Sequence, residues 1–210
     1  MSDVELLDYS HEHLRYEIWM FFNSGLELSR RQFDESDPAS VFSKNILVES
    51  FVNHLRNLLL FLYPYSPKPD DVLSDLFFAD PVNDWKKKRQ TESEFLRDAR
   101  KRASQEISHL TVLRREPTDD SKKWPVVKLM SAVKAILKAF VDNASGSKLN
   151  PSVIDLVNEI DLDIGSAPAR DTFKPVGATT TAPRVTVVVA PSATEPITSV
   201  SSSSLPVKRP

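Results

Sequence analysis

The sequence predicts an all-α protein, an up-and-down bundle of four to five helices over residues 1–164 followed by a disordered tail over residues 165–210. Apolar residues recur at spacings of three, four and seven in the first part, and no alternating strand pattern interrupts them. Prolines and capping residues fall between these apolar segments, where helices end. The last 46 residues hold seven of the fifteen prolines and a single aromatic, Phe173, so they cannot bury enough apolar surface to offset the entropy of ordering.

Two long helices are expected over residues 4–33 and 39–63. The first has one apolar stripe, made of Leu7, Leu14, Ile18, Phe21, Gly25 and Leu28. The second begins after Pro38 and is stopped by Pro64, since proline lacks a donor and disfavours helix in the residue before it. Its last residues, 58–62, are apolar on all sides, which places them at the centre of the bundle.

Three further helices complete the expected bundle, after a short helix or turn over residues 70–78. One starts at a capping box formed by Thr91 and Glu94 and ends at Pro117. The next starts near Ser121, with a proline in its first turn, and stops at residues 145–146. A last short helix starts at residues 150–151.

Composition excludes several classes of protein. The chain has no cysteine, so it has no disulfide framework, thiolate zinc site or cysteine nucleophile. Its four glycines are scattered, whereas phosphate-binding loops need clustered glycines. The histidines His11 and His13 stand too close for two ligands on one helical face, so no metal and no other cofactor is expected. With no signal peptide and no transmembrane run, we expect a soluble cytoplasmic protein without a membrane partner.

Charge is divided unequally along the chain. Residues 1–85 carry 6 basic and 15 acidic side chains, a formal charge of −9, while residues 86–123 carry 12 basic and 7 acidic side chains, a formal charge of +5. The basic segment could form a surface that attracts phosphate. Charge alone leaves two alternatives open, a solvated helix face and self-association between acidic and basic faces.

A polar stripe runs along the second helix, on a helix that is otherwise apolar. Its members lie within about 120° of arc at 100° per residue, and they are Glu49, Ser50, Asn53, Arg56 and Asn57. A buried charge is costly unless it is paired, so Arg56 would need a carboxylate partner. The stripe is either a buried network that fixes helix register or the lining of a ligand cleft.

Arg102 and His109 form a second candidate pair, with the spacing R-x6-H. Two turns of helix return to nearly the same azimuth, so the two side chains share a face roughly 10 Å apart along the axis. A histidine can act as general base or acid near neutral pH, and an arginine can stabilise charge on a phosphorane. Together they are the minimum for metal-free cleavage of RNA by its own 2′-hydroxyl; the alternative is a surface or packing histidine.

Two stretches, residues 49–62 and residues 107–114, resemble a group of small uncharacterised bacterial helical proteins and the wider HEPN superfamily. The resemblance implies a helical bundle, usually dimeric, with an R-x4-6-H ribonuclease motif in active members, many of which serve toxin–antitoxin or phage-defence systems. Arg102 and His109 would then be the motif pair, and Arg56 and Asn57 would line the same cleft. The residue after the motif arginine is usually polar and is Ala103 here, which leaves open an inactive relative or a site in which Arg56 supplies the cation.

Two functions therefore follow as hypotheses. In the first, a homodimeric HEPN-like protein binds or cleaves RNA, with His109 as general base, Arg102 or Arg56 as electrostatic stabiliser and Asn57 as orienting group. In the second, the chain is a non-catalytic interaction module whose polar stripe is structural and whose tail recruits a partner protein.

Overall fold

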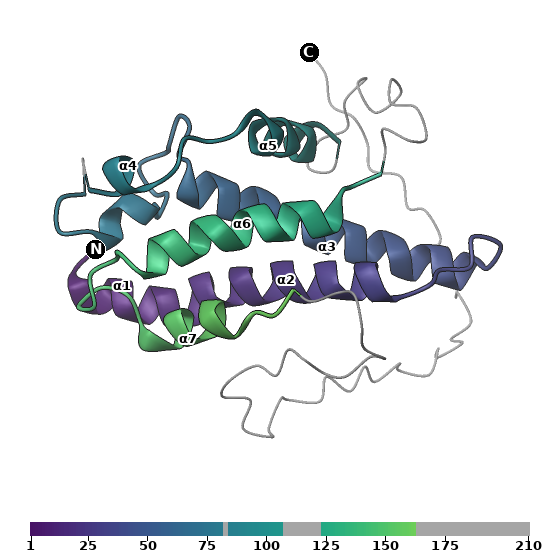
Figure 1. Ribbon diagram of the computed structural model, residues 1–210, viewed down its shortest axis with the longest axis horizontal. Helices are drawn as coiled ribbons and strands as arrows, with labels where there is room; N and C mark the ends of the chain where they lie inside the picture. Colours follow the sequence, from purple (N-terminus) through teal and green to yellow (C-terminus); the bar gives the residue numbers. More distant parts are fainter. Residues whose placement is uncertain (82–83, 107–122, 163–210) are drawn as a thin grey trace, which may run out of the picture. The chain divides into compact units, whose positions relative to one another are not determined.

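The computed structural model of the chain describes residues 1–81, 84–106 and 123–162, and all of these belong to one compact unit. Every regular element in these residues is helical, so the predicted all-α class is confirmed (Figure 1). No helix in this part of the chain combines the length and the apolar character needed to cross a bilayer. The predicted disordered tail, residues 165–210, lies outside the described residues.

The first predicted helix is one continuous element built from three segments, α1 (Asp3–Tyr9), η1 (Ser10–Leu14) and α2 (Arg15–Arg30). The middle segment is a π-helical turn, in which the backbone N–H of the residue after it donates to the carbonyl of Ser10, five positions earlier. The Ser10 hydroxyl, fully buried, accepts a hydrogen bond from the backbone of Asn150 at 3.0 Å. The π turn is therefore anchored to the C-terminal part of the bundle.

Helix α3 (Pro38–Leu62) returns antiparallel to α2. Asp37 caps its start by accepting hydrogen bonds from two backbone N–H groups of the first turn, and Pro38 occupies the first helical position. The ring of Phe51 stacks on the ring of Phe21 with centroids 4.8 Å apart. Beside them, Gly25 lets the helices approach, since a Cβ there would lie 2.5 Å from the Met130 sulfur.

The C-terminal half of α3 is the centre of the bundle, as its apolar sequence predicts. Most of its apolar side chains are buried, as are the rings that surround Phe140 on α6 (Val126–Val141). The segments η2 (Ser74–Phe77) and α4 (Asp84–Lys88) supply part of this aromatic cluster. We define the aromatic cluster as Phe61, Phe77, Phe78, Trp85 and Phe140, whose ring pairs lie edge-to-face or stacked with centroids 5.3 to 5.9 Å apart.

Helix α5 (Glu94–Glu106) starts later than its predicted capping box. The backbone N–H of Leu96 donates to the hydroxyl of Ser93, so Ser93 caps the helix and the prediction that Thr91 does so is wrong. The carboxylate of Glu92, next to this cap, accepts two hydrogen bonds from Arg100. The predicted end of this helix at Pro117 lies outside the described residues.

The last two helices are predicted unequally well. Helix α6 presents its predicted apolar stripe to the core, but it begins at Val126, directly after Pro125, and not near Ser121 with that proline in its first turn. It ends at Val141, before the predicted stop at residues 145–146. Helix α7 (Pro151–Glu159) begins with the predicted cap, because the side chain of Asn150 accepts a hydrogen bond from the backbone of Ser152. In Figure 1, α6 and α7 lie along α2, so two helices from the C-terminal part of the described sequence pack on the N-terminal helix.

Candidate functional site

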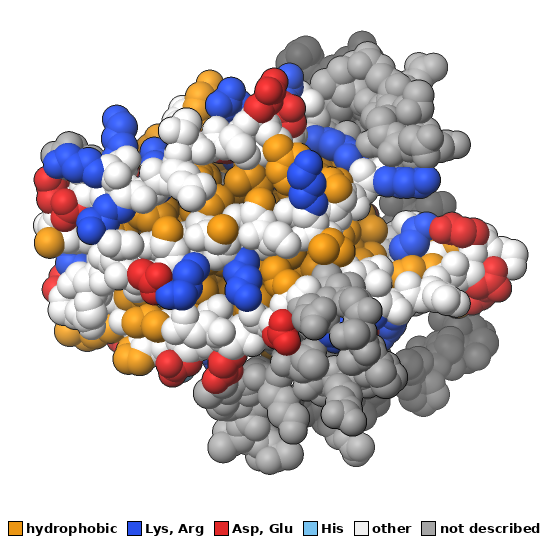
Figure 2. Space-filling view, viewed as in Figure 1, with side chains coloured by type: hydrophobic (Ala, Val, Ile, Leu, Met, Phe, Trp, Pro, Cys, Tyr) orange, Lys and Arg blue, Asp and Glu red, His pale blue; other side chains and the backbone are white. Residues whose placement is uncertain are grey.

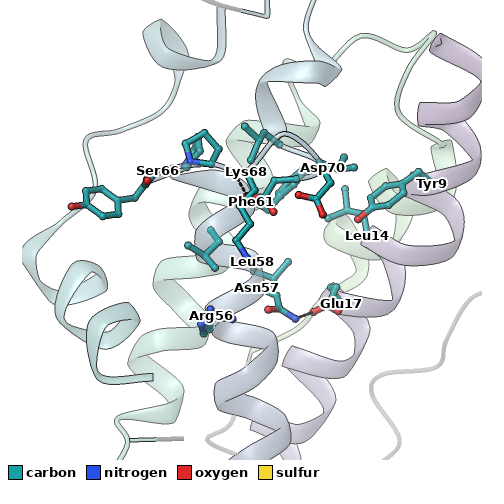
Figure 3. Close-up of a pocket in the computed structure, with 17 residues that line it drawn as sticks. Tyr9, Leu14, Glu17, Arg56, Asn57, Leu58, Phe61, Ser66, Lys68 and Asp70 are labelled. Atoms are coloured by element: carbon teal, nitrogen blue, oxygen red, sulfur yellow. Dashed lines mark hydrogen bonds between the residues drawn. The ribbon is translucent and has the colours of Figure 1, made fainter. Parts of the chain in front are cut away.

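A pocket with a volume of about 540 Å³ opens between the N-terminal helix, the C-terminal half of α3 and the loop that follows it (Figure 3). Apolar side chains such as Leu58 and Phe61 form part of its wall. The charged and polar side chains of its wall are Glu17, Arg56, Asn57, Lys68, Asp70 and Asp71, with the hydroxyls of Tyr9, Tyr65 and Ser66. This mixture of apolar surface and few polar groups is typical of small-ligand sites.

The loop over residues 64–73 closes one side of the pocket. Its prolines restrict the backbone, and Ser66 adopts a positive φ of 51°, which non-glycine residues rarely do. Within it, the backbone N–H of Lys68 donates to the carboxylate of Asp71 at 2.7 Å, and the N–H of Asp71 returns to the carbonyl of Lys68 at 3.1 Å. The loop therefore has a defined turn that holds the side chains of Lys68 and Asp70 at the pocket.

Glu17 is the hydrogen-bonding centre of the pocket floor. Its Oε2 lies 2.8 Å from Nδ1 of His54 and accepts a hydrogen bond from Nδ2 of Asn57 at 3.1 Å. Because an ionised carboxylate only accepts, Nδ1 of His54 is the donor in this contact. The carboxylate thus orients an imidazole and an amide on successive turns of α3.

The Tyr9 hydroxyl lies on the same side of the pocket as Glu17. Burial raises the pKa of Tyr9 above its ordinary value of 10.0, and the negative charge of Glu17 raises it further. Both causes disfavour the phenolate. Tyr9 therefore stays a neutral hydroxyl in the pocket at physiological pH.

Arg56 connects the pocket to α5. Its Nε donates to the hydroxyl of Ser104 at 3.1 Å, and the residue is partly buried between the two helices. Ser104 lies two residues after Arg102, the arginine of the predicted R-x6-H pair. The structure thus brings the polar residues of α3 against the helix that carries the motif arginine.

Arg102 itself does not line the pocket. Its guanidinium lies 4.1 Å from the ring centroid of Trp124, and its Nη1 donates to the carbonyl of Lys123 at 3.0 Å. Between Arg102 and Ser104, Ala103 is fully buried, so the polar residue expected at this position of the motif would face the core. His109 lies outside the described residues, and its placement relative to Arg56 and Arg102 stays a prediction.

The polar stripe on α3 is not a buried network. Glu49, Asn53 and Asn57 are exposed, and only Ser50 and Arg56 are partly buried. Of the two alternatives for the stripe, the buried Glu–Arg–Asn network is contradicted, because its Glu and Asn members are exposed and Arg56 donates a hydrogen bond to Ser104 on α5. Asn57 nevertheless lines the pocket with Arg56, as the cleft interpretation of the stripe predicts.

Sequence reasoning did not single out Glu17, which lines the pocket, or its hydrogen-bond partner His54. His54 precedes Asn57 by one helical turn, so a shared partner for the two was a geometric option. Nothing in the sequence identifies Glu17 as that partner, since it lies 37 residues from His54 on a different helix.

The described part of the basic segment lies mainly on α4 and α5. Lys86, Lys87 and Lys101 are exposed, and Arg97 keeps 59% of its side-chain surface in solvent. Figure 2 shows Lys and Arg side chains spread over the face formed by α4, α5 and α6, with apolar side chains between them. This face can attract a phosphate backbone over a broad area.

Among the described residues, no three His, Asp or Glu side chains group closely enough to hold a metal ion.

Comparison of the chain with protein-family models, with curated proteins and with solved structures gives no match. Its function is therefore argued from the pocket, the contact between α3 and α5, and the charge of its surface.

Proposed function

We propose that this protein binds RNA and cleaves it without a metal ion, as a HEPN-like helical protein acting in a toxin or defence context. The observation that carries the proposal is the contact between Arg56 and Ser104, with Nε and Oγ 3.1 Å apart. It joins a polar pocket on α3 to the helix that begins the R-x6-H sequence. The exposed cations of α4 and α5 would attract the RNA backbone to the same part of the molecule.

The proposed chemistry needs three roles and no cofactor. A general base, His109, takes the proton of a ribose 2′-hydroxyl, whose oxygen attacks the adjacent phosphorus. Arg56 or Arg102 stabilises the negative charge of the phosphorane. The bond to the 5′-oxygen then breaks, that oxygen takes a proton, and a 2′,3′-cyclic phosphate is left. Asn57, held by Glu17, orients the RNA in this scheme.

The test is a cleavage and binding assay on single-stranded RNA in the presence of a chelator. We expect wild-type protein to shorten the RNA, and His109→Ala and Arg56→Ala to lower the rate by at least about 100-fold, as is typical for a lost acid–base or charge-stabilising group. Arg31→Ala is the matched control, because Arg31 is an exposed arginine directly after α2 that lies outside the basic segment and does not line the pocket. Circular dichroism checks that each variant keeps its helices.

Equal cleavage by wild type and His109→Ala would remove the catalytic role of that histidine. A wild-type protein that neither cleaves nor binds RNA would overturn the whole proposal.

A second candidate function is a non-catalytic interaction module, in which the C-terminal tail recruits a partner protein. The observation that favours it is the position of Arg102, whose guanidinium packs on Trp124 and bonds a backbone carbonyl within the chain. An arginine used in this way supports packing. The same assay separates the two functions, since the module neither binds nor cleaves RNA.

A further inference from the structure

Two charged side chains at the pocket have no partner for their charged groups among the described residues. These are the ammonium of Lys68 and the carboxylate of Asp70, both in the loop after α3 and both directed to the pocket in Figure 3. Asp71, by contrast, is used within the loop, where it accepts the N–H of Lys68. The pocket therefore offers one donor and one acceptor of opposite charge to a ligand.

Elsewhere, the wall of the pocket adds one more acidic side chain and one more basic side chain. Glu17 adds a second carboxylate, with Oε2 engaged by His54 and Asn57 and 27% of its side chain still exposed. Arg56 adds a second cation, whose Nε donates a hydrogen bond to Ser104. A ligand that carries only positive charge would be repelled by Arg56 and Lys68. One that carries only negative charge would be repelled by Glu17 and Asp70. The pocket suits a ligand that has both an anionic group and amine donors.

An aromatic side chain stands at the rim beside these charges. Tyr65 is 75% exposed, although large aromatic side chains are usually buried. Arg100 lies over its ring, 5.6 Å from the centroid, and is itself fixed by two hydrogen bonds to Glu92 of 3.0 and 2.9 Å. Tyr65 is thus a supported flat surface at the side of the pocket toward α5, suited to stacking.

We infer that the pocket holds one unpaired nucleotide, with the exocyclic amine of its base accepted by Glu17 and Asp70, its phosphate against Lys68 and Arg56, and the flanking base on Tyr65. A nucleotide carries the anion, the amine and the flat ring that these side chains match. The pocket volume of about 540 Å³ is large enough for a nucleotide, since small-molecule sites range over roughly 300–1,000 Å³. The inference rests on the proposed function in taking the nucleotide to be part of an RNA strand.

A preference among bases follows from the carboxylates. Adenine, cytosine and guanine each carry an exocyclic amine, and uracil carries none. A carboxylate accepts a hydrogen bond from such an amine, whereas it repels the carbonyl oxygens of uracil. Strands of adenine or cytosine should bind more tightly than strands of uracil.

The experiment measures binding of fluorescent oligoadenylate, oligocytidylate and oligouridylate by anisotropy, with the full chain. We expect wild type to bind the first two about tenfold more tightly than the third. Tyr65→Ala should weaken binding by about 5- to 150-fold, the range for loss of one base-stacking contact, while Tyr65→Phe should retain it. Asp70→Asn should reduce the preference over oligouridylate. Phe42→Ala is the control, since Phe42 is an equally exposed aromatic far along α3 that does not line the pocket.

The outcomes separate this inference from the proposed function. If wild type binds long RNA but Tyr65→Ala and Asp70→Asn bind oligonucleotides as wild type does, the pocket inference is overturned and RNA binding stands. If wild type binds adenosine monophosphate, with loss in Asp70→Asn or Lys68→Ala, but does not bind or cleave RNA, the pocket is a nucleotide site and the proposed function fails. Absence of binding to both RNA and adenosine monophosphate overturns both.

Discussion

The aromatic cluster around Phe140 and the pocket are built on the same stretch of α3, and Phe61 belongs to both. In the aromatic cluster, the polar groups are paired internally: Trp85 Nε1 donates to the carbonyl of Leu62, and Ser74 donates to that of Phe61. In the pocket, charged groups of Lys68 and Asp70 have no partner within the described residues. One region thus pairs its polar groups inside the fold, while the other leaves two exposed charged groups without a partner among the described residues.

Replacing Phe140 gives the largest expected effect on stability. Its ring contacts four other members of the aromatic cluster, so Phe140→Ala should lower the free energy of unfolding by about 3–5 kcal/mol. Denaturant unfolding followed by circular dichroism measures this loss. A loss below about 1 kcal/mol would mean that the cluster is not the stabilising region.

Replacing Arg56 should change stability little and RNA cleavage strongly. Arg56→Ala removes one hydrogen bond from a partly buried side chain, so the free energy of unfolding should fall by only about 1 kcal/mol. Its effect should appear instead in RNA cleavage, as proposed above. A loss of stability as large as that of Phe140→Ala would assign Arg56 to the structural region.

Replacing Glu17 tests whether the pocket is an electrostatic unit. Glu17→Gln removes the charge that adds to the effect of burial on Tyr9, so the pKa of Tyr9 should fall and yet stay above its ordinary value. Nuclear magnetic resonance of labelled tyrosine during a pH titration measures this change. Tyr63 is the control, because burial raises its pKa and Glu17 contributes nothing to it. An unchanged Tyr9 pKa would show that Glu17 does not set the charge of the pocket.

The smallest effect is expected at Asp75, which belongs to η2 beside the aromatic cluster. Burial raises the pKa of Asp75 above its ordinary 3.8, and the charges of Arg89 and Lys86 offset this only in part. A raised pKa means that the stability due to the protonated acid is present below its unfolded pKa and is lost as pH rises through the folded pKa. Asp75→Asn should therefore raise the melting temperature at neutral pH and not at about pH 3. A gain of equal size at both pH values would contradict this assignment.

Local signals in the sequence predict most of the helices. The cap and proline at residues 150–151 define the start of α7, and Pro38 defines the start of α3, because these residues act through neighbouring backbone groups alone. The start of α5 is less well predicted. Thr91 and Ser93 can both cap a helix, and the local sequence does not decide between them.

The pocket could be predicted only in part. Arg56 and Asn57 stand out because they are polar residues on an apolar helix, and both line the pocket. Their exposure and their partners Ser104 and Glu17 depend on how three helices pack, which periodicity within one helix does not give. The loop residues Lys68 and Asp70 carry no sequence pattern at all that links them to α3.

The π-helical turn over Ser10–Leu14 determines where Tyr9 lies. This turn holds one residue more than an α-helical turn, and each residue of an α-helix corresponds to about 100° of rotation. Deleting a single residue there, with α2 kept in place, would swing the phenol of Tyr9 by about that angle and carry it away from the carboxylate of Glu17.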